Sequence, residues 1–295
     1  MLRPTESAVI TQIENERRYR MVLAHDYHPS LVLPLWDPSP VDLGAVGYLS
    51  KPRGAFITLF NAFHPNRSSL EAVRALPKVD GYGRVNTGSQ RVTKRTLLDT
   101  IMGLLTFKNK NDGVFPYVLA EDSCTITDCV FRQPVSRRYT FPLKAGHRAA
   151  FLCAETTDYR YMISEEGEQL DSPKKWFKAN ADAIMKIFGA QHQIQREELF
   201  LVVGTLRAPN YALFVSHNHP EGHAHFNVFT SPKGGQPWGM FTTDSEYEGV
   251  GPSIDAPDES SRQSASKVSV HGGPWDTVLV ARLRFKPDAV EPTTL

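Results

Sequence analysis

The order of apolar and polar positions along the chain predicts a β-rich fold with a small number of helices. Apolar residues recur at helical spacing in the stretches 5–23, 91–105 and 171–189. Short apolar or alternating runs, which are typical of strands, fill most of the remaining positions. The predicted strands lie in pieces across 31–63 and at 114–119, 125–131, 137–143, 148–154, 199–206, 211–231 and 275–285.

The order of these elements decides the fold class. Helical and strand patterns do not alternate regularly, which argues against a parallel, doubly wound sheet. We therefore expect an α+β fold, built as an antiparallel β-sheet or sandwich with two or three packed helices. The length of 295 residues and the hydrophobic content of 41% suit a single domain over 1–295, with a polar surface loop at 244–268.

Two of the predicted elements have the clearest signals. Asp171, Ser172 and Pro173 predict a helix start, with a capping residue and proline at the first helical position. Residues 199–206 form the most apolar strand pattern and should therefore be central in a sheet. The apolar stripe of the helix is expected at Trp176, Asn180, Ile184, Ile187 and Phe188.

A cluster of histidines is the most informative chemical feature of the chain. Four of the ten histidines fall within nine residues, namely His217, His219, His223 and His225. Alternating positions on both sides of a short turn at 220–222 predict a β-hairpin. In that hairpin the histidines of the two strands would face one another in pairs. All four imidazoles would then share one face, because side chains alternate along a strand.

A shared face of imidazoles is a candidate metal site. Neutral imidazole is a good ligand for zinc and other divalent transition metals. Three ligands and a water make a catalytic zinc site, whereas four protein ligands close it. Glu221 in the turn is the candidate catalytic base, and Asn227 follows on the same face as the histidines. The same cluster is also compatible with a pH sensor or with an exposed loop tip that binds nothing.

The histidine segment, with its order His217-Asn-His219-Pro, resembles the His-x-His-Pro stretch of JAB/MPN metalloproteases and RadC-type proteins. The resemblance implies zinc ligation by His217 and His219. Where that family continues with a serine and an aspartate ligand, this chain has Val228 and Ser231. The third ligand would therefore have to be one of the two later histidines. The family's catalytic glutamate lies upstream on another strand, which makes Glu155 the candidate for that role here.

Three further features have candidate chemistry. Residues 81–88 are glycine-rich and precede basic residues, so they could cradle a phosphate or form an ordinary surface loop. Cys124, Cys129 and Cys153 contain no C-x-x-C pair and are interpreted as small buried hydrophobes, with a nucleophilic Cys153 as the alternative. Trp238 could wall a small-ligand pocket, together with the glycine-rich segment.

Charge and cysteine content limit the partners and the compartment. The net charge is +1, from 33 basic and 32 acidic residues, and does not call for a nucleic acid. No apolar run of about 18 residues predicts a membrane span. The first twenty residues are polar and do not resemble a secretory signal. With only three cysteines, the expected location is the cytoplasm, and the expected partner is a small molecule or a protein.

Longer segments of the chain resemble a family of proteins from mushroom-forming basidiomycete fungi. The resemblance is carried by residues 47–63, 175–180, 201–206, 211–231 and 275–285. It implies a fungal, intracellular protein with one architecture over most of the chain. The family has no assigned activity, so the resemblance transfers no site residues.

Taken together, these features predict a metal-dependent enzyme, most specifically a zinc hydrolase with its site on the 211–231 hairpin. The bound metal would lower the pKa of a water molecule and polarise a carbonyl. The alternative is a non-enzymatic binding or signalling module of a fungal cell. A third interpretation is a small-ligand pocket bordered by Trp238 and residues 81–88.

Overall fold

The computed structural model describes residues 6–51, 53–80, 84–91, 134–163, 170–216, 219–244 and 264–294. Within these ranges the chain forms three α-helices and 13 strands, and the named strands pair antiparallel. The predicted α+β, sandwich-like and β-rich architecture is therefore confirmed. The helices are α1 (Glu6–Val22), α2 (Glu71–Arg74) and α4 (Asp171–His192), with short 3₁₀ turns at Pro65–Arg67 and Arg196–Glu198.

The largest sheet has seven strands and is organised around β8. β13 pairs with one edge of β8, while β2 and β7 share the other edge. All but one residue of β8 are buried, which explains its continuous apolar sequence and confirms its predicted central position. The strands of this sheet are β1 (Leu33–Ser39), β13 (Asp276–Arg284), β8 (Phe200–Ala208), β2 (Ala45–Leu49), β3 (Phe56–Asn61), β7 (Thr156–Ile163) and β4 (Arg84–Arg91).

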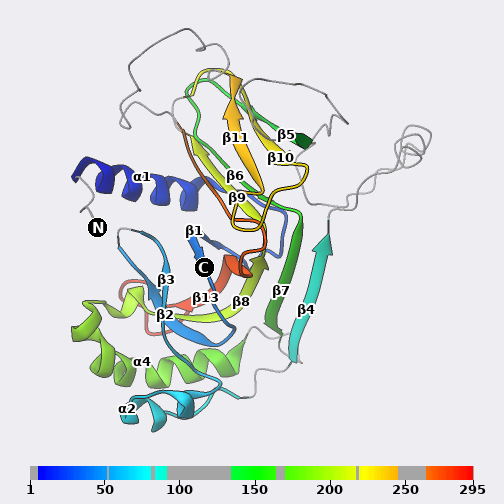
Figure 1. Cartoon of the computed structure of the whole chain (residues 1–295). Coiled ribbons are helices and arrows are strands. Elements are labelled where there is room, and N and C mark those ends of the chain that lie inside the picture. Colours follow the sequence, from blue (N-terminus) through cyan, green and yellow to red (C-terminus); the bar gives the residue numbers. More distant parts are fainter. Residues whose placement is uncertain are drawn as a thin grey trace, which may run out of the picture.

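Two three-stranded sheets form a small sandwich above the large sheet (Figure 1). One has the order β11-β10-β5 and the other has the order β12-β9-β6. Aromatic rings from both sheets fill the space between them, as in the pair Phe214–Phe241 at 5.0 Å between ring centroids. The strands are β5 (Val135–Leu143), β6 (Ala149–Ala154), β9 (Tyr211–Ser216), β10 (Gly222–Phe229), β11 (Gly239–Thr243) and β12 (Ser264–Val268).

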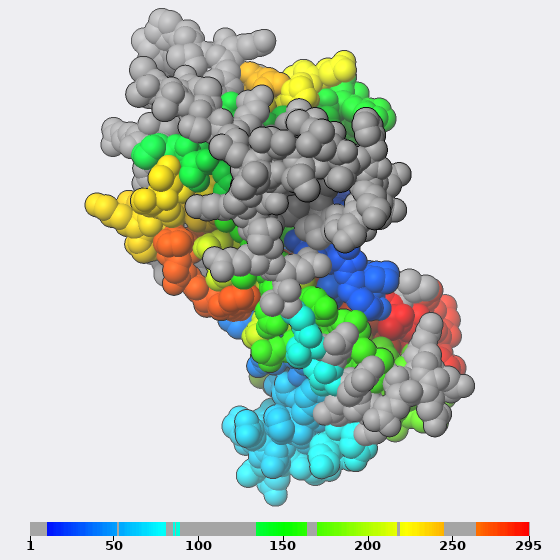
Figure 2. All heavy atoms as spheres, turned by 90° about the vertical axis from the view of Figure 1, so that its right-hand side faces the viewer, coloured from blue at the N-terminus to red at the C-terminus, as the bar shows by residue number. Residues whose placement is uncertain are grey.

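The two long helices cover different parts of this framework. α4 packs beneath the large sheet, where the rings of Phe177 and Phe285 lie 5.1 Å apart (Figure 1). α1 contacts β1, β6 and β9, and its fully buried Tyr19 packs on Trp36. The sandwich and α2 lie at opposite ends of the molecule (Figure 2). No helix among the described residues is long and apolar enough to cross a membrane.

Helix α4 confirms its predicted stripe but begins differently from the expected capped start. Leu170 precedes the helix in a left-handed conformation with φ 51°, and no side chain caps the first turn. The Ser172 hydroxyl instead donates to the carbonyl of Asp80, tying the helix to the loop after α2. The helix ends at His192, beyond the expected Gly189.

The predicted hairpin at 211–231 is wrong. β9 pairs with β6 and β12, whereas β10 pairs with β5 and β11. The connection between them carries the chain from one sheet of the sandwich to the other. Both strands place aromatic side chains, such as Phe214 and Phe226, in the core between the sheets. The alternation of apolar and polar residues does mark two strands, but these strands face one another across a core instead of sharing hydrogen bonds.

Several other predictions fall partly or wholly on residues outside the described ranges. These are the strands at 114–119 and 125–131 and nearly all of the helix at 91–105. Of the polar loop at 244–268, the last residues form β12, which pairs with β9.

Candidate functional site

Strand β10 divides its side chains between the sandwich core and the opposite face of its sheet. Ala224, Phe226 and Val228 are buried in the core. His223, His225 and Asn227 alternate with them and lie on the other face. We call this surface the outer face, comprising His223, His225, Asn227, Arg138, Thr140, Thr242 and Asp244.

The strand register brings the remaining members of the outer face to the histidines. His225 of β10 lies opposite Thr140 of β5 and Thr242 of β11. Asn227 lies opposite Arg138 on one side and Met240 on the other. Asp244 directly follows β11, at the end where that strand passes the two histidines.

One carboxylate holds both imidazoles of the outer face. His225 Nε2 lies 2.8 Å from Asp244 Oδ1, and His223 Nδ1 lies 3.2 Å from Asp244 Oδ2. The backbone amide of His223 also donates to Asp244 Oδ2, at 2.8 Å. Partial burial alone would raise the pKa of Asp244, but the hydrogen bonds from His225 and His223 lower it below its ordinary value. The carboxylate is therefore ionised at neutral pH and fixes both rings.

The two histidines differ in how many of their ring nitrogens already have a hydrogen-bond partner. The Nδ1 atom of His225 lies 3.1 Å from the hydroxyl of Thr140, so both of its ring nitrogens have partners. The side chain of His223 is 50% exposed, and its carboxylate contact is made through Nδ1. Because a carboxylate only accepts, neutral His223 has its proton on Nδ1 and its lone pair on Nε2. The Nε2 atom of His223 can therefore accept a hydrogen bond or bind a metal ion.

A second hydrogen-bond chain continues the outer face along the strands. Arg138 Nε donates to Asn227 Oδ1 at 2.8 Å, and Asn227 Nδ2 donates to the Thr242 hydroxyl at 3.1 Å. Asn227 is fully buried although it points away from the sandwich core. A buried amide that is bonded on both sides rigidifies the three strands at this point.

The predicted site residues are not gathered as one group. His223 and His225 lie together, with ring centroids 6.0 Å apart. His219 is only 3% exposed, and its Nδ1 lies 2.9 Å from the carbonyl of Pro220. Glu221 is exposed in the connection before β10, and His217 falls outside the described residues.

The absence of the hairpin removes the geometric reason for pairing the four histidines. Within the part of the chain that the structure describes, no group of three or more His, Cys, Asp or Glu residues is arranged to hold a metal ion. Sequence reasoning also missed Asp244 and Thr140. In the sequence each is only a polar residue, Thr140 within a strand and Asp244 just after one. Their contacts with His225 depend on strand pairing between segments that are distant in the sequence.

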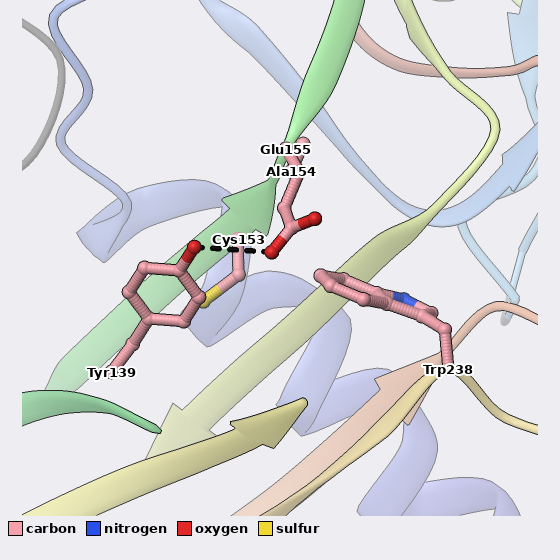
Figure 3. Close-up of a pocket in the computed structure, with 5 residues that line it drawn as sticks. All are labelled: Tyr139, Cys153, Ala154, Glu155 and Trp238. Atoms are coloured by element: carbon pink, nitrogen blue, oxygen red, sulfur yellow. Dashed lines mark hydrogen bonds between the residues drawn. The ribbon is translucent and has the colours of Figure 1, made fainter. Parts of the chain in front are cut away.

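Cys153, Glu155 and Trp238 line a small pocket inside the sandwich, together with Tyr139 and Ala154 (Figure 3). The Tyr139 hydroxyl donates to Glu155 Oε1 at 3.1 Å, and Arg137 pairs with the same oxygen at 2.7 Å. Burial, and then the charge of Glu155, raise the pKa of the Cys153 thiol far above its ordinary value. Cys153 is therefore a protonated, buried hydrophobe, as predicted, and not a nucleophile at neutral pH. Cys124 and Cys129 lie outside the described residues.

From residue 84 onward the glycine-rich segment is a β-strand, and it does not form the phosphate-binding loop that was one of its two interpretations. It forms β4, which pairs with β7, and residues 81–83 fall outside the described ranges. A Cβ atom at Gly88 would lie 2.2 Å from the ring of Tyr159, its cross-strand partner. Glycine is needed here because the Tyr159 ring occupies the space that a Cβ atom would take. Trp238 lines a small pocket, and its indole N–H donates to the Tyr211 carbonyl. The other lining residues come from β5, from β6 and from Glu155 just after β6, and none comes from the described part of the glycine-rich segment.

The sequence matches no protein-family model, and the comparison with curated proteins gives no match either. The site has therefore to be interpreted from its own geometry.

Proposed function

We propose that the chain is a binding module that engages an acidic segment of a protein partner through the outer face of β11-β10-β5. The observation that carries this proposal is that Asp244 contacts the rings of both His223 and His225 within hydrogen-bonding distance. A ring held in place by a carboxylate loses little freedom when a ligand binds, so more of the contact energy contributes to affinity. The exposed Nε2 edge of His223 is the part of this group that a partner would meet.

Charge complementarity supports an acidic partner. Arg138 is only partly buried, and its bond to Asn227 uses Nε. Among the described residues, the two terminal nitrogens of its guanidinium group are left for an external carboxylate. His223 lies opposite Pro142, just before an exposed turn that contains Lys144 and Arg148. One cation, Arg138, therefore lies on the outer face, and Lys144 and Arg148 lie past its end, whereas Asp244 is already engaged by the histidines.

The outer face also offers an apolar contact. Met240 lies opposite Asn227 on β11 and is 37% exposed. Methionine and arginine are enriched in protein interfaces, where an apolar centre is surrounded by polar groups. The exposed parts of this face, at His223, Arg138 and Met240, suit an extended segment of another protein better than an enclosed small molecule.

The binding proposal is tested with a fluorescein-labelled poly-glutamate peptide, followed by fluorescence anisotropy at low ionic strength. We expect Arg138→Gln and His223→Ala each to weaken binding about two- to fivefold, as for exposed charged contacts. Added salt should weaken binding to the wild type, because exposed charges are screened.

The matched control is Arg74→Gln on α2, which removes the same charge at the other end of the molecule. Equal affinities for Arg138→Gln, His223→Ala and Arg74→Gln would show that the peptide does not bind at the outer face. Binding of an uncharged Gly-Ser peptide as tightly as poly-glutamate would also contradict the proposal.

A divalent transition metal is the second candidate, and the zinc hydrolase interpretation depends on it. It is favoured by one observation, the presence of two imidazoles that each lie within hydrogen-bonding distance of the same carboxylate. Two histidines and a carboxylate form a recurrent metal-ligand set. The histidines would exchange their bonds to Asp244 for bonds to the metal, and Glu221 stays the candidate base.

The metal candidate is tested by elemental analysis of protein purified in the presence of zinc. The expected result is about one zinc per chain, lost in His223→Ala and retained in His147→Ala, which removes an exposed histidine elsewhere. Protein that is free of zinc, or that keeps it after His223→Ala, would rule this site out.

A further inference from the structure

Arg282 of β13 has a buried guanidinium that its surroundings leave partly unpaired. Its Nε and Nη1 atoms are shielded from solvent and have no hydrogen-bond partner among the residues that the structure describes. The guanidinium carbon lies 4.5 Å from the centroid of the Phe200 ring. The ring covers the flat surface of the cation, but it does not satisfy N–H groups that point outward in the guanidinium plane. Because buried donors are normally bonded, two unsatisfied donors on one cation indicate a missing acceptor.

The neighbouring charges make an anionic acceptor favourable. Arg284 lies two residues along β13 and therefore on the same face of the strand. Burial, and then the charges of Arg284 and of Arg20 on α1, lower the pKa of Arg282 to about 9. Three guanidinium groups from two elements thus act on one region. Arg20 itself pairs with Glu16 at 3.3 Å, so Arg20 contributes positive charge to the region and Arg282 contributes the unpaired donors.

We propose that Arg282 binds a small oxyanion of the phosphate or carboxylate type, in a region that the charges of Arg284 and Arg20 make positive. The forked donors of arginine match the spacing of oxygen atoms in both groups. Arg282 as a whole is only partly buried, so the site lies close to the protein surface. The site lies on the seven-stranded sheet, far along the chain from the outer face, and it does not depend on the binding function proposed above.

The proposal is tested by thermal unfolding of the full chain in phosphate, acetate and chloride at equal ionic strength. We expect phosphate or acetate to raise the melting temperature in a saturable way, and chloride to have no such effect. The two oxyanion series distinguish a phosphate ligand from a carboxylate one. Arg282→Met should abolish the response, because methionine keeps an apolar stem and removes the donors. Arg74→Met is the matched control and should respond like the wild type.

A second variant and a direct readout keep the test decisive if Arg282→Met does not fold. Arg20→Gln leaves Arg282 in place and should raise the anion concentration for half-saturation several-fold. In spectra of protein labelled with ¹⁵N-arginine, the Nε–H signal of Arg282 should shift as phosphate or acetate is added. An unchanged Arg282 signal, or equal responses in the wild type and Arg282→Met, would overturn the oxyanion site.

Discussion

Replacing Phe226 with alanine should lower the free energy of unfolding by about 3–5 kcal/mol, the range for removing a fully buried phenylalanine. The ring is fully buried, meets Trp238 edge-on at 4.7 Å and lies 4.8 Å from the ring of Phe241. These rings belong to a core that two separate sheets build from opposite sides, so neither sheet can move inward without losing its other contacts. Urea denaturation followed by far-ultraviolet circular dichroism should show a lower midpoint with an unchanged slope.

The matched control is Phe229→Ala at the last residue of the same strand. Phe229 is only half-buried and belongs to none of the buried core clusters of the described residues. Its truncation should cost about 1 kcal/mol or less, since little apolar area is withdrawn from water at that site. Equal losses at Phe226 and Phe229 would mean that the sandwich core does not stabilise the fold in the way that its packing indicates.

The elements that the sequence predicts well are those whose signal is local. The period of α4 follows from its apolar stripe, in which Trp176, Ile184 and Phe188 recur on one side and are buried in the structure. The central position of β8 follows from a run that is apolar on both faces. In both cases the sequence of the segment alone indicates which of its faces is buried, namely one side of α4 and both faces of β8.

The failed hairpin shows where local signals stop being sufficient. The segments before and after 220–222 alternate in the way that either a hairpin or two facing strands would require. What separates the two cases is the choice of partner strand, and β10 selects β5, which lies far away in sequence. A short connection between two strands predicts a tight turn within one sheet, whereas here it joins β9 and β10, which belong to different sheets.

The candidate site was predicted in part for the same reason. The shared face of His223 and His225 follows from the two-residue period of a strand alone, and it is present on β10. Thr140, which contacts His225, is 85 residues away and comes from another strand. Asp244 is 19 residues away from His225 and becomes its partner only because β11 pairs with β10. The sequence predicts the histidine pair, but not the carboxylate that gives the pair its geometry.

Replacing Asn227 with leucine should lower the free energy of unfolding by about 1–3 kcal/mol, although leucine has a similar volume. Asn227 is fully buried and bonds Arg138 on one side and the Thr242 hydroxyl on the other. Leucine would leave the largely buried hydroxyl of Thr242 without this partner, and the Arg138 Nε atom would lose its acceptor. The same denaturation measurement as for Phe226 provides the value.

A double-mutant cycle decides whether this loss comes from the hydrogen bond or from altered packing. Thr242→Val removes only the hydroxyl, so its cost alone should be about 1 kcal/mol. When Asn227→Leu and Thr242→Val are combined, no hydroxyl remains to be left unsatisfied. The combined loss should therefore be smaller than the sum of the two single losses, by about 0.5–1 kcal/mol. If the two losses simply add, the hydrogen bond between Asn227 and Thr242 does not stabilise the outer face, and the cost of Asn227→Leu must arise at Arg138 or from packing.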